Sequence, residues 1–114
     1  MAALYKRATM SKTNDPLDPL DCTNMAEVRA GVDAVDEAMI GLLAHRFGYM
    51  DAAARIKTDR DSVRDEARKA QVLAHVKTAA SAAGVPVEAA GSLWENLIEI
   101  SIAYEFSQWD ALRR

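Results

Sequence analysis

Cysteine, proline, glycine and aromatic residues are all scarce in this chain of 114 residues. Its single cysteine, Cys22, excludes an intramolecular disulfide, as is usual for proteins of a reducing compartment. With 3 prolines, 5 glycines and 6% aromatic residues, the chain lacks the turn signals and strand formers of a sandwich or barrel. No apolar run reaches the ~18 residues of a membrane span, and the N-terminal stretch lacks the apolar core of a secretory signal. We therefore expect a cytoplasmic protein with no membrane partner.

Charge is nearly balanced, and this excludes further classes of function. The net charge of −3 provides no general basic field, so we expect no nucleic-acid partner. No spacing of histidine, cysteine and carboxylate residues suggests a metal site, so we expect no metal. Half of the residues are hydrophobic and 27% are charged, a balance typical of a chain that folds into one domain. A few local cations could still bind a small anion.

The longest predicted element is an amphipathic helix over residues 23–57. Asn24, followed three residues later by Glu27, is a good helix start, and Thr23 is a competing cap. The helix would be ~50 Å long, whereas a compact monomer of this size is only ~25–30 Å across. Its apolar residues alternate at spacings of four and three, as in a helix that faces a partner helix along its whole length. This line, which we call the seam, consists of Val28, Val32, Val35, Met39, Leu42, Arg46, Tyr49, Ala53 and Ile56.

The remainder of the chain predicts two further helices. Residues 1–20 are mixed, polar and punctuated by proline, so we expect a flexible tail there and a helical domain over 21–114. A polar break at residues 58–64 separates the first helix from a second over 65–83, which Gly84 would end. A third helix is predicted over residues 87–112. We expect an all-α protomer of three helices whose seam is covered by a second chain.

Polar residues interrupt the apolar faces at four positions. Arg46 and Lys57 lie on the first helix, 11 residues apart, and therefore share one face at ~20° and ~16 Å separation. Ser101 and Glu105 interrupt the third helix. A structural ion pair of Glu105 with Lys57 or Arg46 is one interpretation; another is that both cations grip a small dianion. Arg29 points off that face, and could reach only a partner's ligand in a dimer or be a solvated helix arginine.

Three stretches carry a resemblance to a known family: DCTNMAEVRAGVDAVDEAMIGLLAHRFGYMDAAARIK, VRDEARKAQVL and LWENLIEISIAYEFSQW. They resemble the all-helical chorismate mutases, the AroQ class, over about residues 21–110. The resemblance implies an intertwined, helix-swapped homodimer with two equivalent sites. It also implies a small dicarboxylate substrate and a reaction without a cofactor.

The resemblance also implies roles for the residues that interrupt the faces. Arg46 matches an arginine that binds a substrate carboxylate, and Lys57 matches the lysine at the ether oxygen. Arg29 matches the arginine that the partner chain contributes. Ser101 matches a serine near the ring carboxylate, and Glu105 matches the Gln/Glu position that donates a hydrogen bond to the ether oxygen.

The start of the second helix fits the family less closely. Asp65 and Arg68 fall where the family has an acidic residue and an arginine, but Lys69 stands where mutases commonly have a glutamate that holds the substrate's hydroxyl. Glu66, nearly one turn earlier, could substitute. The Asp-Cys-Thr lead-in and the Phe-Gly-Tyr-Met segment are similar to those of isochorismate pyruvate lyases, which share this fold.

Three hypotheses about function follow. The first is chorismate mutase, which converts chorismate to prephenate. The second is isochorismate pyruvate lyase, which forms salicylate and pyruvate, or an enzyme with both activities. The third is a non-catalytic helical dimerisation module whose charged residues set the register of its helices.

Overall fold

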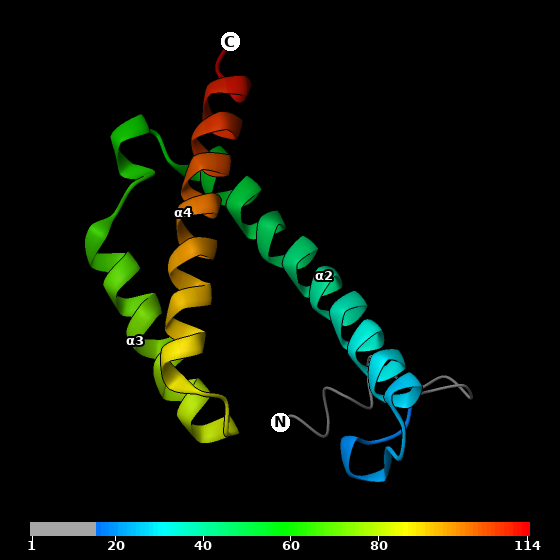
Figure 1. The fold of residues 1–114 in the computed structure, drawn as a ribbon. Helices are drawn as coiled ribbons and strands as arrows, with labels where there is room; N and C mark the ends of the chain where they lie inside the picture. Colours follow the sequence, from blue (N-terminus) through cyan, green and yellow to red (C-terminus); the bar gives the residue numbers. More distant parts are fainter. Residues whose placement is uncertain (1–15) are drawn as a thin grey trace. The chain divides into compact units, whose positions relative to one another are not determined.

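The computed structural model describes residues 16–114, and every regular element in that range is helical. The order is η1 (Pro19–Asp21), α2 (Met25–Ile56), η2 (Arg60–Ser62), α3 (Glu66–Ala83) and α4 (Val87–Leu112) (Figure 1). The prediction of an all-α chain with a long first helix is confirmed for this range. The predicted tail lies mostly outside it, and the domain boundary at residue 21 stays a prediction. No helix among the described residues is long and apolar enough to cross a membrane.

The chain divides into two compact units, Met1–Arg46 and Phe47–Arg114, with the boundary inside α2. In the first unit, Asn24 caps α2 as predicted. Its Oδ1 accepts the Glu27 backbone N–H at 3.0 Å. The Glu27 carboxylate reaches back and accepts from the N–H of Thr23 at 2.9 Å, which lowers the pKa of Glu27. These bonds satisfy N–H groups that the first turn of a helix leaves unpaired.

The seam of α2 is exposed within this one chain. Its first five members are between 37% and 52% exposed: Val28, Val32, Val35, Met39 and Leu42. Tyr49 and Ile56, which continue the seam, are 63% and 69% exposed. A Cβ added at Gly31, Gly41 or Gly48 would meet no atom within 4 Å. The apolar side of α2 therefore contributes little to the core of its own chain.

The second unit holds all of the buried apolar residues of the described range: Ala54, Val63, Ala80, Ala90 and Ile98. Within it α3 and α4 lie side by side (Figure 1). Their short connection depends on Gly84, whose φ of 78° lies in the left-handed region that favours glycine. The backbone N–H of Val85 then donates to the Ala80 carbonyl at 2.9 Å. The chain thereby reverses and α4 begins at Val87, as predicted.

Candidate active site

A buried carboxylate paired with a lysine forms the centre of the candidate site. Glu105 lies on α4 and is only 4% exposed, and its Oε2 is 2.7 Å from Nζ of Lys57, the residue that follows α2. The Lys57 side chain is 29% exposed. A buried carboxylate without a partner would be destabilising by several kcal/mol. Of the two partners that the sequence allows for Glu105, the structure shows Lys57.

Ser101 lies one turn before Glu105 on α4 and is 3% exposed. Its Oγ donates a hydrogen bond to the Leu97 carbonyl at 2.7 Å. A hydroxyl whose proton is used in this way presents acceptor lone pairs to other groups. Ser101 and Glu105 are the buried polar side chains of the described range, so the two polar residues predicted on the third helix are indeed buried.

The last turn of α4 holds the backbone of Lys57. The indole Nε1 of Trp109 donates to the Lys57 carbonyl at 3.0 Å. The Arg113 guanidinium donates to the same carbonyl at 2.7 Å and to the Ala54 carbonyl at 3.0 Å. Trp109 and Arg113 were not predicted as site residues, although they follow Glu105 at intervals of four, which places all three along one side of α4 and its C-terminal cap.

The polar segment after Lys57 is held by the same end of α4. Arg60 forms a bidentate pair with Asp110, at 2.8 and 3.1 Å, and its guanidinium lies 4.6 Å from the ring centroid of Phe106. The fork of two parallel bonds lowers the pKa of Asp110. Hydrogen bonds therefore connect the C-terminal end of α4 both to the end of α2 and to η2.

At the start of α3, two predicted site residues form hydrogen bonds within the first turns of the helix. The Asp65 carboxylate caps the helix, accepting the Arg68 backbone N–H at 3.0 Å. The Arg68 side chain is exposed, and its Nη1 lies 3.5 Å from Oε1 of Gln71. The structure thus places Asp65 and Arg68 together at the N-terminus of α3.

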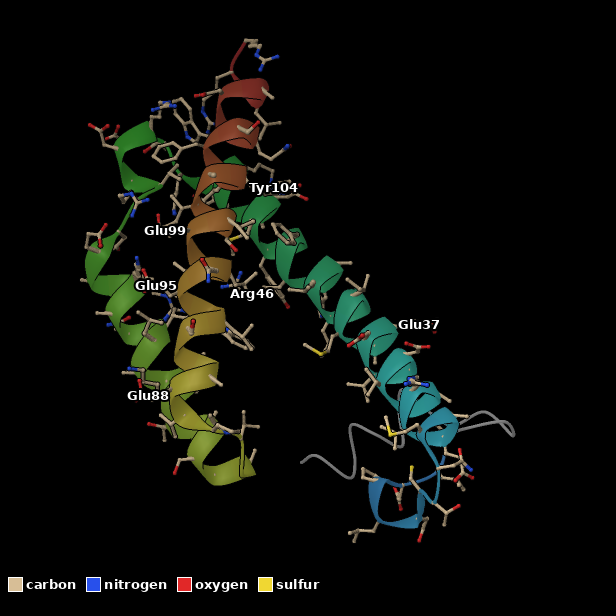
Figure 2. All side chains as sticks on the ribbon, in the orientation of Figure 1. Glu37, Arg46, Glu88, Glu95, Glu99 and Tyr104 are labelled. Carbon is tan, nitrogen blue, oxygen red and sulfur yellow. The ribbon has the colours of Figure 1, made fainter. Side chains whose placement is uncertain are left out.

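Lys69 does not join Lys57 and Glu105. Its Nζ lies 2.6 Å from a Glu95 carboxylate oxygen and 2.8 Å from one of Glu99, which raises the pKa of Lys69. Figure 2 shows Glu95 and Glu99 on the side of α4 toward α3. Arg64 completes the network at 2.7 Å from Glu99 and 2.9 Å from Glu66. Hydrogen bonds from Arg64 and Lys69 lower the pKa of Glu99 to about 2.

The other two predicted site residues lie on the first unit. Arg29 is exposed in the second turn of α2, and Arg46, labelled in Figure 2, is partly buried at the end of the unit. Both belong to the same continuous helix, α2. Lys57 and Glu105 belong to the second unit.

Comparison with known proteins identifies the family of this chain. The model of the family described as chorismate mutase type II matches residues 28–106. The chain belongs to the chorismate mutase type II family. Arg29, Arg46, Lys57 and Glu105 all fall inside the matched residues, whereas Trp109 lies beyond them.

A relative with a curated name carries a different activity. It is an isochorismate pyruvate lyase from Pseudomonas aeruginosa, 27% identical over 95 residues, which are 83% of this chain and 94% of the relative. A chain of the chorismate mutase type II family is thus similar to a protein that is named for a different reaction.

The ion-pair network predicts a pH-dependent stability. The pKa of Glu99 is about 2 in the folded chain against an ordinary value of 4.5, so its stabilising effect is present above pH 4.5 and is lost as pH falls through about 2. The urea concentration at the unfolding midpoint should therefore fall less steeply between these pH values in Glu99→Gln than in the wild type. Urea unfolding followed by circular dichroism measures this. Glu37→Gln, a change in the middle of α2, is the control, and a Glu99→Gln profile as steep as the wild type would contradict the prediction.

Proposed function

We propose that the protein is a chorismate mutase that rearranges chorismate to prephenate. The observation that carries the proposal is the Lys57–Glu105 contact of 2.7 Å: an ammonium and a buried carboxyl face each other in a chain of this family. These are the two groups that we expect at the ether oxygen of the substrate. Neither needs a metal or an organic cofactor for this role.

The proposed reaction needs shape and charge rather than a nucleophile. In the rearrangement an ether C–O bond breaks while a C–C bond forms within one molecule, and no proton leaves. The enzyme accelerates it by holding the compact chair-like conformer and by stabilising the negative charge that develops on the ether oxygen. The Lys57 ammonium would oppose that charge. Arg46, with Arg29 from a partner chain, would bind the carboxylates, since guanidinium groups bind carboxylates bidentately.

Glu105 can serve this reaction in only one of its protonation states. An ionised Glu105 accepts from Lys57, as the structure shows, but it has no proton to donate to an ether oxygen. A protonated Glu105 can donate one, and it also releases the Lys57 ammonium for the substrate. A hydrogen bond from Glu105 to the ether oxygen therefore requires the protonated carboxyl.

A second candidate is isochorismate pyruvate lyase, alone or together with the mutase activity. Two observations favour it. The Pseudomonas aeruginosa relative of that name aligns over 94% of its length, and the Lys69 ammonium is bound by Glu95 and Glu99 at the position where mutases commonly have a hydroxyl-binding glutamate. The lyase substrate carries its hydroxyl elsewhere on the ring, so that glutamate is less needed. In either enzyme, Asp65, Arg68 and Ser101 would line the substrate.

One assay separates the candidates. We predict that the pure protein forms prephenate from chorismate, and that Lys57→Ala and Arg46→Ala each lower kcat/KM by about 100-fold or more, as expected for loss of a charge-stabilising group. Chromatographic detection of prephenate and salicylate, with chorismate and isochorismate supplied separately, measures both reactions. Arg55→Ala, on the exposed last turn of α2, is the matched control. Salicylate alone would establish the lyase, and turnover of neither substrate would favour a non-catalytic module.

We also propose that two chains form an intertwined, helix-swapped homodimer. The support is the exposed apolar seam of α2, whose 32 residues extend ~48 Å. A second α2 would cover residues such as Val35 and Met39, which are 47% and 48% exposed. Each Å² of apolar surface removed from water contributes ~25 cal/mol, so covering these side chains favours association. The partner would then supply Arg29 to each site.

A pair of variants tests the dimer. Val35→Glu should dissociate it because the new carboxylate would be buried in an apolar interface. Ala44→Glu, about 180° away around α2, introduces the same charge on the opposite side and should leave the dimer intact. Light scattering coupled to size-exclusion chromatography measures the mass. A wild type that is monomeric at assay concentrations would contradict the proposal.

A further inference from the structure

Lys57 occupies a position where its backbone needs outside support. It directly follows the last residue of α2, and its N–H still donates to the Ala53 carbonyl at 2.9 Å. The last four carbonyls of a helix have no partner within the helix. Here the carbonyls of Ala54 and Lys57 accept three hydrogen bonds of 2.7 to 3.0 Å, donated by Trp109 of α4 and by Arg113, the C-cap residue of that helix.

The groups that hold Lys57 follow one another at intervals of four residues along α4. Glu105 binds the ammonium, Trp109 binds the carbonyl, and Arg113 binds the same carbonyl. Residues at this spacing lie on one side of a helix, one above the other. One side of α4 therefore fixes a single lysine at both ends, its charged tip and its backbone.

Arg113 is itself held in orientation. Its guanidinium carbon lies 4.1 Å from the ring centroid of Trp109, a cation–π contact. Its Nη1 also lies 3.2 Å from the Trp109 carbonyl. The two donors to Lys57 thus stabilise each other's position. The Arg60–Asp110 pair ties η2 to the same turn of α4.

We propose that Trp109 and Arg113 are positioning residues that set where the Lys57 ammonium lies, an inference that rests on the proposed function of Lys57. The lysine stem has four rotatable carbons, and an ammonium at a reacting oxygen must be placed to within a fraction of an ångström. Fixing the carbonyl end of Lys57 fixes the origin of that stem. The ionised Glu105 carboxylate holds the tip, so an ammonium that its protonation releases still depends on the fixed backbone for its position. Both positioning residues lie beyond residues 28–106, the part of the chain that the family model matches.

Substitutions that remove single donors test the proposal. Trp109→Phe removes the indole N–H and keeps an aromatic ring beside Arg113, and Arg113→Lys keeps the charge but loses the two-pronged donor. We expect kcat to fall about 10-fold in Arg113→Ala and in Trp109→Phe, with KM changed less than about 2-fold, because misplacement of a catalytic group affects mainly the transition state. Arg113→Lys should recover part of kcat. Arg114→Ala, at the adjacent arginine, should match the wild type.

A readout without substrate separates this inference from the proposed function. The Lys57 ammonium, bound to Glu105, should give a distinct proton–nitrogen NMR signal that Trp109→Phe and Arg113→Ala weaken or shift and Arg114→Ala leaves unchanged. If the wild type turns over neither substrate but these signals change as expected, the function is wrong and the positioning role stands. An unchanged signal and an unchanged kcat in both variants would overturn the inference. A fall in kcat that only follows the folded fraction measured by circular dichroism would also overturn it.

Discussion

The contact between Lys57 and Glu105 joins the residue that follows α2 to the second half of α4, and Trp109 and Arg113 bind the backbone of the same lysine. Glu105 is 4% exposed, so a cation must accompany its charge, and well-packed hydrophobic residues in place of both members of the pair would often serve stability as well. Trp109 and Arg113 add three hydrogen bonds whose combined effect is to hold the backbone from which that cation extends. The side chains that satisfy the carbonyls at the end of α2 thus also fix the position of one lysine, as the proposed function requires of its ammonium.

The two units of the chain differ in how far their apolar side chains are buried. The second unit buries small and medium residues such as Ala54, Ala90 and Ile98, and ion pairs on α3 and α4 reinforce it. The seam of α2 leaves valines, methionine and leucine about half exposed. A chain that forms its core in one unit and exposes an apolar helix face in the other is suited to assembly with a copy of itself. The proposed dimer would complete both the fold and the site.

Local signals in the sequence were sufficient to predict the helices. Asn24 and Gly84 mark ends of α2 and α3 because caps are determined by residues within one turn of each other. Lys57 was one of the two predicted partners of Glu105, because a charged residue on an apolar face must be paired with an opposite charge. Trp109 escaped prediction because its acceptor is a backbone carbonyl, which has no signature in sequence. The partners of Lys69 also escaped, because they depend on the register between α3 and α4 rather than on spacing along one helix.

The central claim, that the Lys57–Glu105 pair is the reaction centre, is tested most directly by chorismate turnover in two substitutions of Glu105. The measurement is kcat/KM of the wild type, Glu105→Gln and Glu105→Ala, with circular dichroism to check that each variant is folded. A glutamine side chain can still donate a hydrogen bond to the ether oxygen, whereas alanine cannot. We expect Glu105→Gln to stay within about 10-fold of the wild-type kcat/KM and Glu105→Ala to lose about 100-fold or more. A folded Glu105→Ala variant with the kcat/KM of the wild type would contradict the claim.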